Sequence, residues 1–216
     1  MKSTTLFLVV TTILVIVAGC ASTGYEKALK TSTSLEQAAA SIDKTGAQVN
    51  ITLAALDDMT SRPGPDLTLQ LKRFDSTIKD LDSMVRDIDT RTAAMRERKT
   101  QFFDQWDRDL ATIHNENIRA RSVQRKTEVM ARFNKVEASY GQVQTAFGPF
   151  MSDLRDIRTA LTTDLTPAGV AAIQEPAKKA NQDAQPVRQA LTQLAAEFRE
   201  LGVKLSASTS QPTTTK

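Results

Sequence analysis

The stretch "VMARFNKVEASYGQVQTAFGPFMSDLRDIRTAL", from Val129 to Leu161, decides the fold. Apolar side chains recur along it in alternating steps of four and three residues, which places them on one stripe of a helix with 3.6 residues per turn. The stripe consists of Val129, Phe133, Val136, Tyr140, Val143, Phe147, Phe150, Leu154, Ile157 and Leu161. The spacing therefore predicts one long helix that buries this stripe against other helices.

Three further stretches carry apolar stripes of the same kind. They run over residues 28–56, 67–106 and 170–205, and the second weakens where Thr92 and Lys99 occupy stripe positions. The predicted helices span about residues 25–61, 66–112, 116–163 and 167–205. Because short turns force consecutive helices to run back alongside each other, we expect an all-α fold, an elongated antiparallel four-helix bundle of the coiled-coil type.

Helix-breaking residues separate the stripes. The segments "SRPGPD" (residues 61–66), "IHNEN" (113–117) and "TDLTP" (163–167) supply the turns, with Asp66, Asn115 and Thr166 as predicted N-caps. Proline also occurs within helical text, at Pro149, Pro176 and Pro186. Each proline removes a backbone donor, so each should bend or interrupt its helix, and the last helix is either continuous or divided into two or three pieces.

The second and third helices are predicted to be longer than the other two. At about 47 residues each they would be about 70 Å long, whereas the first and fourth have about 38 residues. Laid out from their shared end, the middle pair overhangs by a hairpin tip of residues 104–126, at the same end as the start of the first helix. Six residues in this tip or at its base are candidates for contact with a membrane surface: Phe103, Trp106, Arg119, Arg121, Arg125 and Lys126. In the alternative interpretation, Phe102 and Trp106 belong to the core and the arginines form a solvated helix face.

The first 20 residues have the pattern of an export signal. Lys2 precedes the apolar run "LFLVVTTILVIVA" (residues 6–18), which covers about 20 Å as a helix and is too short for the roughly 30 Å hydrocarbon core. The following "VAGC", made of Val17, Ala18, Gly19 and Cys20, resembles the bacterial lipobox. This resemblance implies a lipoprotein signal peptide over 1–19, cleavage before Cys20 and acylation of its sulfur. An ordinary secretory signal or an uncleaved anchor are the alternatives.

The remaining organisation follows from that interpretation. Residues 20–24 are the acylated cysteine and a short linker, residues 25–205 are the helical domain, and residues 206–216 are a Ser/Thr-rich tail that we expect to be disordered. Ala21, rather than an aspartate, follows the cysteine, and by resemblance to lipoprotein sorting this implies the outer membrane, facing the periplasm.

Composition argues against most catalytic and binding chemistry. The chain has one cysteine and one histidine among 216 residues, too few for a thiolate metal centre or a di-iron centre. A Ser-His-Asp set would have to use His114, which lies at a predicted turn. The formal net charge of +3 is not that of a nucleic-acid binder. We therefore expect no enzyme, no metal, no cofactor other than the covalent lipid on Cys20, and neither nucleic acid nor a small-molecule substrate as partner.

Three blocks of the sequence resemble a known family. They are "FFDQWDRDL" (102–110), "IRARSVQRKTEVMARF" (118–133) and "FGPFMSDLRDIRTALTTDLTPAGVAAI" (147–173). They are similar to bacterial envelope proteins that share a helical, coiled-coil-like domain of unknown function, and the likeness covers roughly residues 25–200. The resemblance implies a recurring helical architecture and no particular activity.

Two classes of function are expected from these features. The first is a lipid-anchored, non-enzymatic scaffold, spacer or adaptor in the cell envelope, with a protein partner or self-association. The second is a membrane-surface or lipid-interacting protein that uses the hairpin tip. A minor alternative is attachment to the cell wall through Lys216, which ends the chain, although the return of the fourth helix to the membrane end argues against it.

Overall fold

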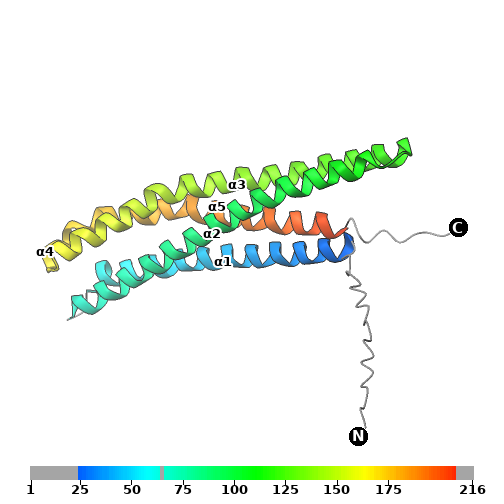
Figure 1. The fold of residues 1–216 in the computed structure, drawn as a ribbon. Helices are drawn as coiled ribbons and strands as arrows, with labels where there is room; N and C mark the ends of the chain where they lie inside the picture. The colour runs from blue at the N-terminus through cyan, green and yellow to red at the C-terminus, as the bar shows by residue number, and fades with distance from the viewer. Residues whose placement is uncertain (1–23, 64–65, 208–216) are drawn as a thin grey trace, which may run out of the picture.

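The computed structural model describes residues 24–63 and 66–207, and these residues form helices without any strand (Figure 1). The helices are α1 (Gly24–Ser61), α2 (Leu67–Ala111), α3 (Glu116–Thr163), α4 (Pro167–Ala172) and α5 (Gln174–Ala207). Both α1 and α3 contact α2 and α5, so the four long helices form a ring of antiparallel neighbours. The predicted all-α bundle is confirmed.

The predicted N-caps are confirmed at all three turns. The side chain of Asp66 accepts a hydrogen bond from the Leu69 amide at 3.3 Å, and that of Asn115 accepts from the Ile118 amide at 3.1 Å. Thr166 Oγ1 accepts from the Gly169 amide at 3.2 Å. Because a cap lies outside its helix, α2 begins at Leu67, one residue later than predicted.

The alternative of a divided last helix is the one observed, because the chain breaks at Ile173 between α4 and α5. Pro176 has no amide hydrogen to donate to the carbonyl of Ala172, so the helical ladder stops and restarts with Pro176 in the first turn of α5, where amides need no helical partner. Gln174 Nε2 donates to the Thr60 carbonyl at 2.9 Å and ties the break to the end of α1. Pro186, by contrast, lies inside a continuous α5.

The turn between α3 and α4 depends on a close backbone approach. A Cβ atom placed on Gly169 would overlap the carbonyl oxygen of Asp164, a backbone atom that cannot swing away as a flexible side chain would. Only glycine fits there without movement of the chain. This turn directs α4 and then α5 back along α3.

The apolar stripes meet in one continuous core along the bundle. All ten positions of the α3 stripe are buried, as are the eleven predicted positions from Val170 to Leu205. The second stripe needs a correction, because Phe103 (6% exposed) takes the buried place that was assigned to Phe102 (41% exposed). The side chain of Lys99, at a polar interruption of that stripe, leaves the core and pairs with Glu137 of α3 at 2.9 Å.

A buried polar cluster joins α1 to α2. Gln48 Nε2 donates to the Thr77 carbonyl at 3.1 Å, and Thr52 Oγ1 lies within hydrogen-bond distance of the carbonyls of Gln48 (2.9 Å) and Thr77 (3.2 Å). Since an unpaired buried polar group is costly, these bonds favour one register of the two helices over its shifted alternatives.

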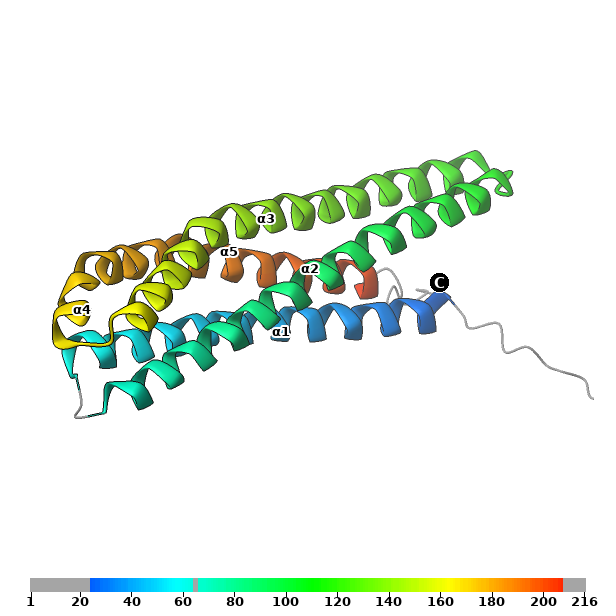
Figure 2. The ribbon, with the colours of Figure 1, turned by 60° about the vertical axis from the view of Figure 1, so that its left-hand side comes forward.

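The register of the helices measures the overhang of the α2–α3 hairpin. Ser41 Oγ donates to Asp87 Oδ2 at 3.2 Å, so α1, which begins at Gly24, starts opposite about residue 104 of α2. From there α2 continues for roughly seven residues, or about 10 Å at 1.5 Å per residue. Arg125 of α3 donates to the Lys204 carbonyl near the end of α5, which leaves a similar length of α3 uncovered. Figure 2 shows the hairpin extending past the ends of α1 and α5, as predicted.

Candidate functional site

An aromatic cluster lies at the base of the hairpin tip. The ring of Phe103 lies 5.7 Å from that of Phe133 and stacks on that of Trp106 at 6.3 Å, measured between centroids. Phe102 contacts Phe103 and Trp106 edge-on at 5.3 and 5.4 Å. Trp106 Nε1 also donates to Ser122 Oγ of α3 at 3.0 Å. These contacts fasten α2 to α3 where the neighbouring helices end, so the overhang is a braced hairpin.

Four of the six predicted membrane-contact residues are engaged within the protein. Phe103 is buried and Trp106 is half-buried in the aromatic cluster. Lys126 forms an ion pair with Asp107 and lies 6.0 Å from the centroid of the Phe103 ring. Arg125 pairs with Glu128 at 3.6 Å, besides its bond to α5.

The other two predicted residues, Arg119 and Arg121, are exposed on the first turns of α3. The structure therefore assigns the aromatic residues of the prediction to the inside of the hairpin and leaves two arginines on its surface. This is the arrangement that the alternative interpretation gave for Trp106, and it removes Phe103 from any surface in this conformation.

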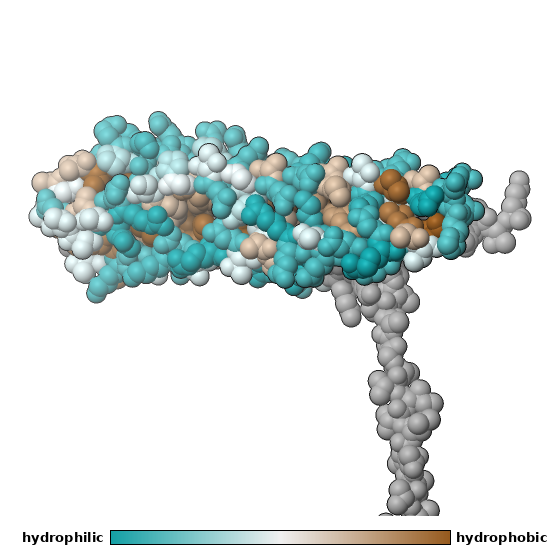
Figure 3. All heavy atoms as spheres, turned by 45° about the horizontal axis from the view of Figure 1, so that its top comes forward, coloured by the Kyte–Doolittle hydropathy of each residue, from teal (hydrophilic) through white to brown (hydrophobic). Residues whose placement is uncertain are grey.

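Sequence reasoning missed two exposed apolar side chains on the tip. Ile118 is 58% exposed and Val123 is 47% exposed. Counting back from Val129 in steps of four, three and four residues leads to Ile118. The spacing therefore already indicated that Ile118 lies on the same face of α3 as the stripe. It is uncovered because α5 ends before reaching it. Figure 3 shows apolar surface at this end of the molecule among hydrophilic side chains.

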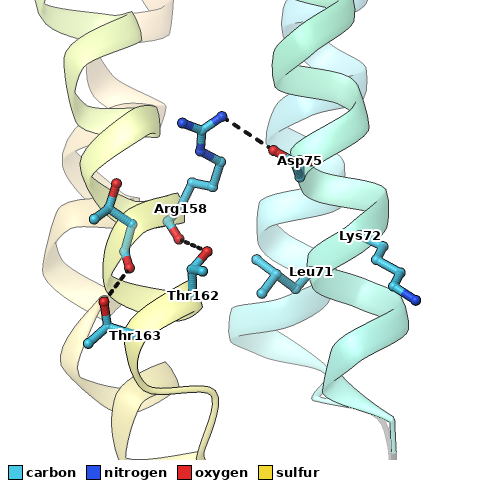
Figure 4. A pocket seen from close by; sticks show the side chains of 7 residues that line it. Leu71, Lys72, Asp75, Arg158, Thr162 and Thr163 are labelled. Atoms are coloured by element: carbon cyan, nitrogen blue, oxygen red, sulfur yellow. Dashed lines mark hydrogen bonds and ion pairs between the residues drawn. The ribbon is translucent and has the colours of Figure 1, made fainter.

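A cleft between α2 and α3 lies at the opposite end of the bundle (Figure 4). Arg158 Nη1 reaches across it to Asp75 Oδ1 at 3.3 Å, and Lys79 Nζ lies 2.6 Å from the other oxygen of the same carboxylate. The hydrogen bond from Lys79, with the nearby charge of Arg158, lowers the pKa of Asp75 despite partial burial. The hydroxyls of Thr162 and Thr163 donate to carbonyls of their own helix at 2.8 and 3.0 Å. The cleft is thus spanned by an ion pair that holds the two helices together.

A second groove follows the seam between α3 and α5. It is lined largely by small side chains and includes Pro149 and Pro186, one from each helix. Gln193 also lines it and donates to Glu197 Oε1 at 2.7 Å. The groove arises because short side chains face each other where the two helices pass.

Several predictions concern residues outside the described part of the chain. Val17, Ala18, Gly19 and Cys20 of the predicted lipobox lie there, as do the residues after 207. Among the residues that are described, no group of three or more His, Cys, Asp and Glu side chains is placed to hold a metal ion. None of the described helices is long and apolar enough to cross a bilayer.

Comparison with known proteins places the chain in one family. Comparison of the chain with curated proteins and with solved structures found no match. A family model described as "Protein of unknown function (DUF2959)" matches residues 18–201, which include α1 to α4 and most of α5. The chain therefore belongs to the DUF2959 family of proteins of unknown function.

Proposed function

We propose that this protein is a lipid-anchored, non-enzymatic scaffold or spacer of the bacterial cell envelope, held at the outer membrane and facing the periplasm. The observation that carries the proposal is the position of α1, which begins at Gly24, only four residues after Cys20. An acyl chain on Cys20 would thus fix one end of the bundle at the membrane surface. Each buried methylene of such chains is worth about 0.8 kcal/mol, and several chains hold a protein stably.

The bundle is suited to carry a partner at a distance. Its core is continuous from α1 to α5, and α3 alone has 48 residues, which correspond to about 72 Å. The ion pairs Arg158–Asp75 (3.3 Å) and Lys179–Asp153 (2.5 Å) tie neighbouring helices at the end far from α1's start. A rigid rod with one anchored end sets the spacing between the membrane and whatever binds the other end.

The proposal includes no catalytic role. Cys20 is assigned to the anchor, and His114 is exposed in the turn between α2 and α3. About half of the acidic side chains of the described residues form ion pairs, such as Asp75 in the α2–α3 cleft. A binding partner is expected to be a protein or a second copy of this chain.

Lipid labelling and fractionation of the Cys20→Ser variant test the anchor. We expect radioactive palmitate to label the natural chain and the matched variant Ser22→Ala, and both to sediment with outer membranes. Cys20→Ser should lose the label and the sedimentation. Unchanged labelling of Cys20→Ser would contradict the proposal.

The scaffold role needs a second measurement. A photo-crosslinking amino acid at Leu69, which is 57% exposed at the end far from α1's start, is expected to capture one dominant protein, or a second copy of the chain, in living cells. A spread of many minor adducts would contradict the scaffold role. Deletion of Lys216 in the same cells should leave the amount recovered with purified cell wall unchanged.

A further inference from the structure

We propose that the tip of the α2–α3 hairpin rests in the head-group layer of the bilayer that holds the anchor, and that it contacts lipid through Ile118, Val123, Arg119 and Arg121. This inference rests on the proposed anchor at Cys20. It differs from the sequence-based expectation because the contacting side chains are those exposed on α3, and the aromatic residues act as an internal brace.

The linker before α1 and the overhang of the hairpin are of similar length. Gly24 follows Cys20 by four positions, and four fully extended residues span at most about 14 Å. The hairpin extends past the start of α1 by about 10 Å, the length of roughly seven helical residues. An anchor at Cys20 therefore leaves the tip no more than a few ångströms from the membrane surface when the bundle stands upright. Any tilt toward the hairpin side brings the tip into the bilayer surface.

The apolar stripe of α3 has an uncovered end. Along the bundle the stripe is buried, from Val129 at 0% exposed to Leu161 at 0% exposed. Ile118 occupies the same stripe but is 58% exposed, because α5 ends short of it. An apolar side chain that projects from the end of a rod at the height of lipid head groups loses its contact with water when it enters that layer.

Exposed arginines lie close in sequence to the exposed apolar side chains of the tip. Arg119 and Arg121 are exposed and follow Ile118 by one and three positions. Arginine stems can cover apolar surface while the guanidinium stays among phosphates, so this mixture suits the membrane interface better than the bilayer core. The neighbouring basic residues Arg125 and Lys126 are held in ion pairs with Glu128 and Asp107. The tip therefore offers two arginines to lipid phosphate groups. With only two such charges, we expect it to bind phospholipids in general rather than to require strongly anionic head groups.

The hairpin is stiff at its base. The contacts among Phe103, Trp106 and Phe133, with the hydrogen bond from Trp106 to Ser122, brace the hairpin at its base. A braced hairpin cannot fold back to hide Ile118 against the bundle without breaking these contacts. Its tip keeps the position that the bundle and anchor give it.

Photo-crosslinking in the full-length, acylated protein tests this inference. Benzoylphenylalanine is placed at position 118 in one strain and at position 69 in another, since Ile118 and Leu69 are both exposed (58% and 57%) and lie at opposite ends of the bundle. After irradiation of intact cells, adducts are identified by mass spectrometry. We expect phospholipid adducts at position 118 and none above the unirradiated background at position 69. Combining the probe at 118 with Cys20→Ser should abolish its lipid adducts.

Each other outcome overturns the inference in a recognisable way. If the protein sediments with membranes but position 118 gives no lipid adduct, the tip does not touch lipid and the anchored scaffold stands. If position 118 is captured by a protein or by a second copy of the chain, the tip is a protein interface. If the natural chain does not sediment with membranes, the anchor and the tip contact fall together.

Discussion

Replacing Phe103 by alanine is expected to cost more stability than replacing its neighbour Phe102. Phe103 is 6% exposed and its ring contacts those of Phe102, Trp106 and Phe133, so its truncation should cost about 3–5 kcal/mol, the range for a fully buried phenylalanine. Phe102 is 41% exposed, and scaling the same range by the buried fraction gives about 2–3 kcal/mol. The difference of about 1–2 kcal/mol is a factor of roughly 5 to 30 in the unfolding equilibrium constant.

Urea denaturation of the chain from Ala21 onward measures both variants, with circular dichroism for the whole bundle and fluorescence for Trp106. Trp106 is the only tryptophan and belongs to the aromatic cluster, so its fluorescence reports on the hairpin base. For Phe103→Ala the fluorescence transition should move to lower urea than for Phe102→Ala. Equal shifts, or a larger shift for Phe102→Ala, would refute the assignment of Phe103 to the core of the hairpin.

Three further predictions use the same protein. Gly169→Ala should destabilise the bundle by about 1–3 kcal/mol, since the added Cβ would overlap a backbone carbonyl. Gly141→Ala, where the Cβ meets open space within α3, should stabilise the bundle by about 0.5–1 kcal/mol. Urea midpoints of the opposite order would contradict the turn geometry. Thr52→Val keeps the branched shape but removes the buried hydroxyl, so the free energy of unfolding should fall by about 1 kcal/mol. Urea midpoints measure this change, and an unchanged midpoint would count against the polar cluster. Burial, together with the hydrogen bond to Asp89, raises the pKa of Tyr140 to about 12. Because the unfolded tyrosine has a pKa of about 10, the stabilising contribution of this group is complete below about pH 10 and is lost as the pH rises to about 12. Ultraviolet absorbance should show this titration, and Asp89→Asn should lower the pKa of Tyr140; an unchanged value would remove the carboxylate as a cause.

Periodicity predicted the bundle because each stripe position from Val129 to Leu161 is buried by a neighbouring helix in the folded chain. The caps at Asp66, Asn115 and Thr166 were predictable for a local reason, since a cap bonds to an amide three residues away. The overhang was also predictable, because it follows from helix lengths and short turns alone. These features depend on local chemistry and chain length.

The sequence left a choice open, or led to the wrong one, where local signals allow two outcomes. Pro176 can bend a helix or begin a new one, and its position in the first turn of α5 decided for the break at Ile173. Phe102 and Phe103 are adjacent aromatics after a stripe blurred by Lys99, so spacing alone did not choose the buried one. The exposure of Ile118 depends on where α5 ends relative to α3. The residues around Ile118 do not determine this, because it follows from the packing of the two helices.

The orientation of the bundle on the membrane is the central claim, and one distance measurement tests it. The purified acylated protein is placed in lipid nanodiscs with energy-transfer acceptors on the head groups, and a donor dye is attached at position 118 or at position 69. The two positions are separated by most of the length of α2, whose 45 residues correspond to about 68 Å. We predict strong transfer from position 118 and little from position 69. Equal transfer from both positions, or stronger transfer from position 69, would show a bundle lying flat or inverted and would contradict the account.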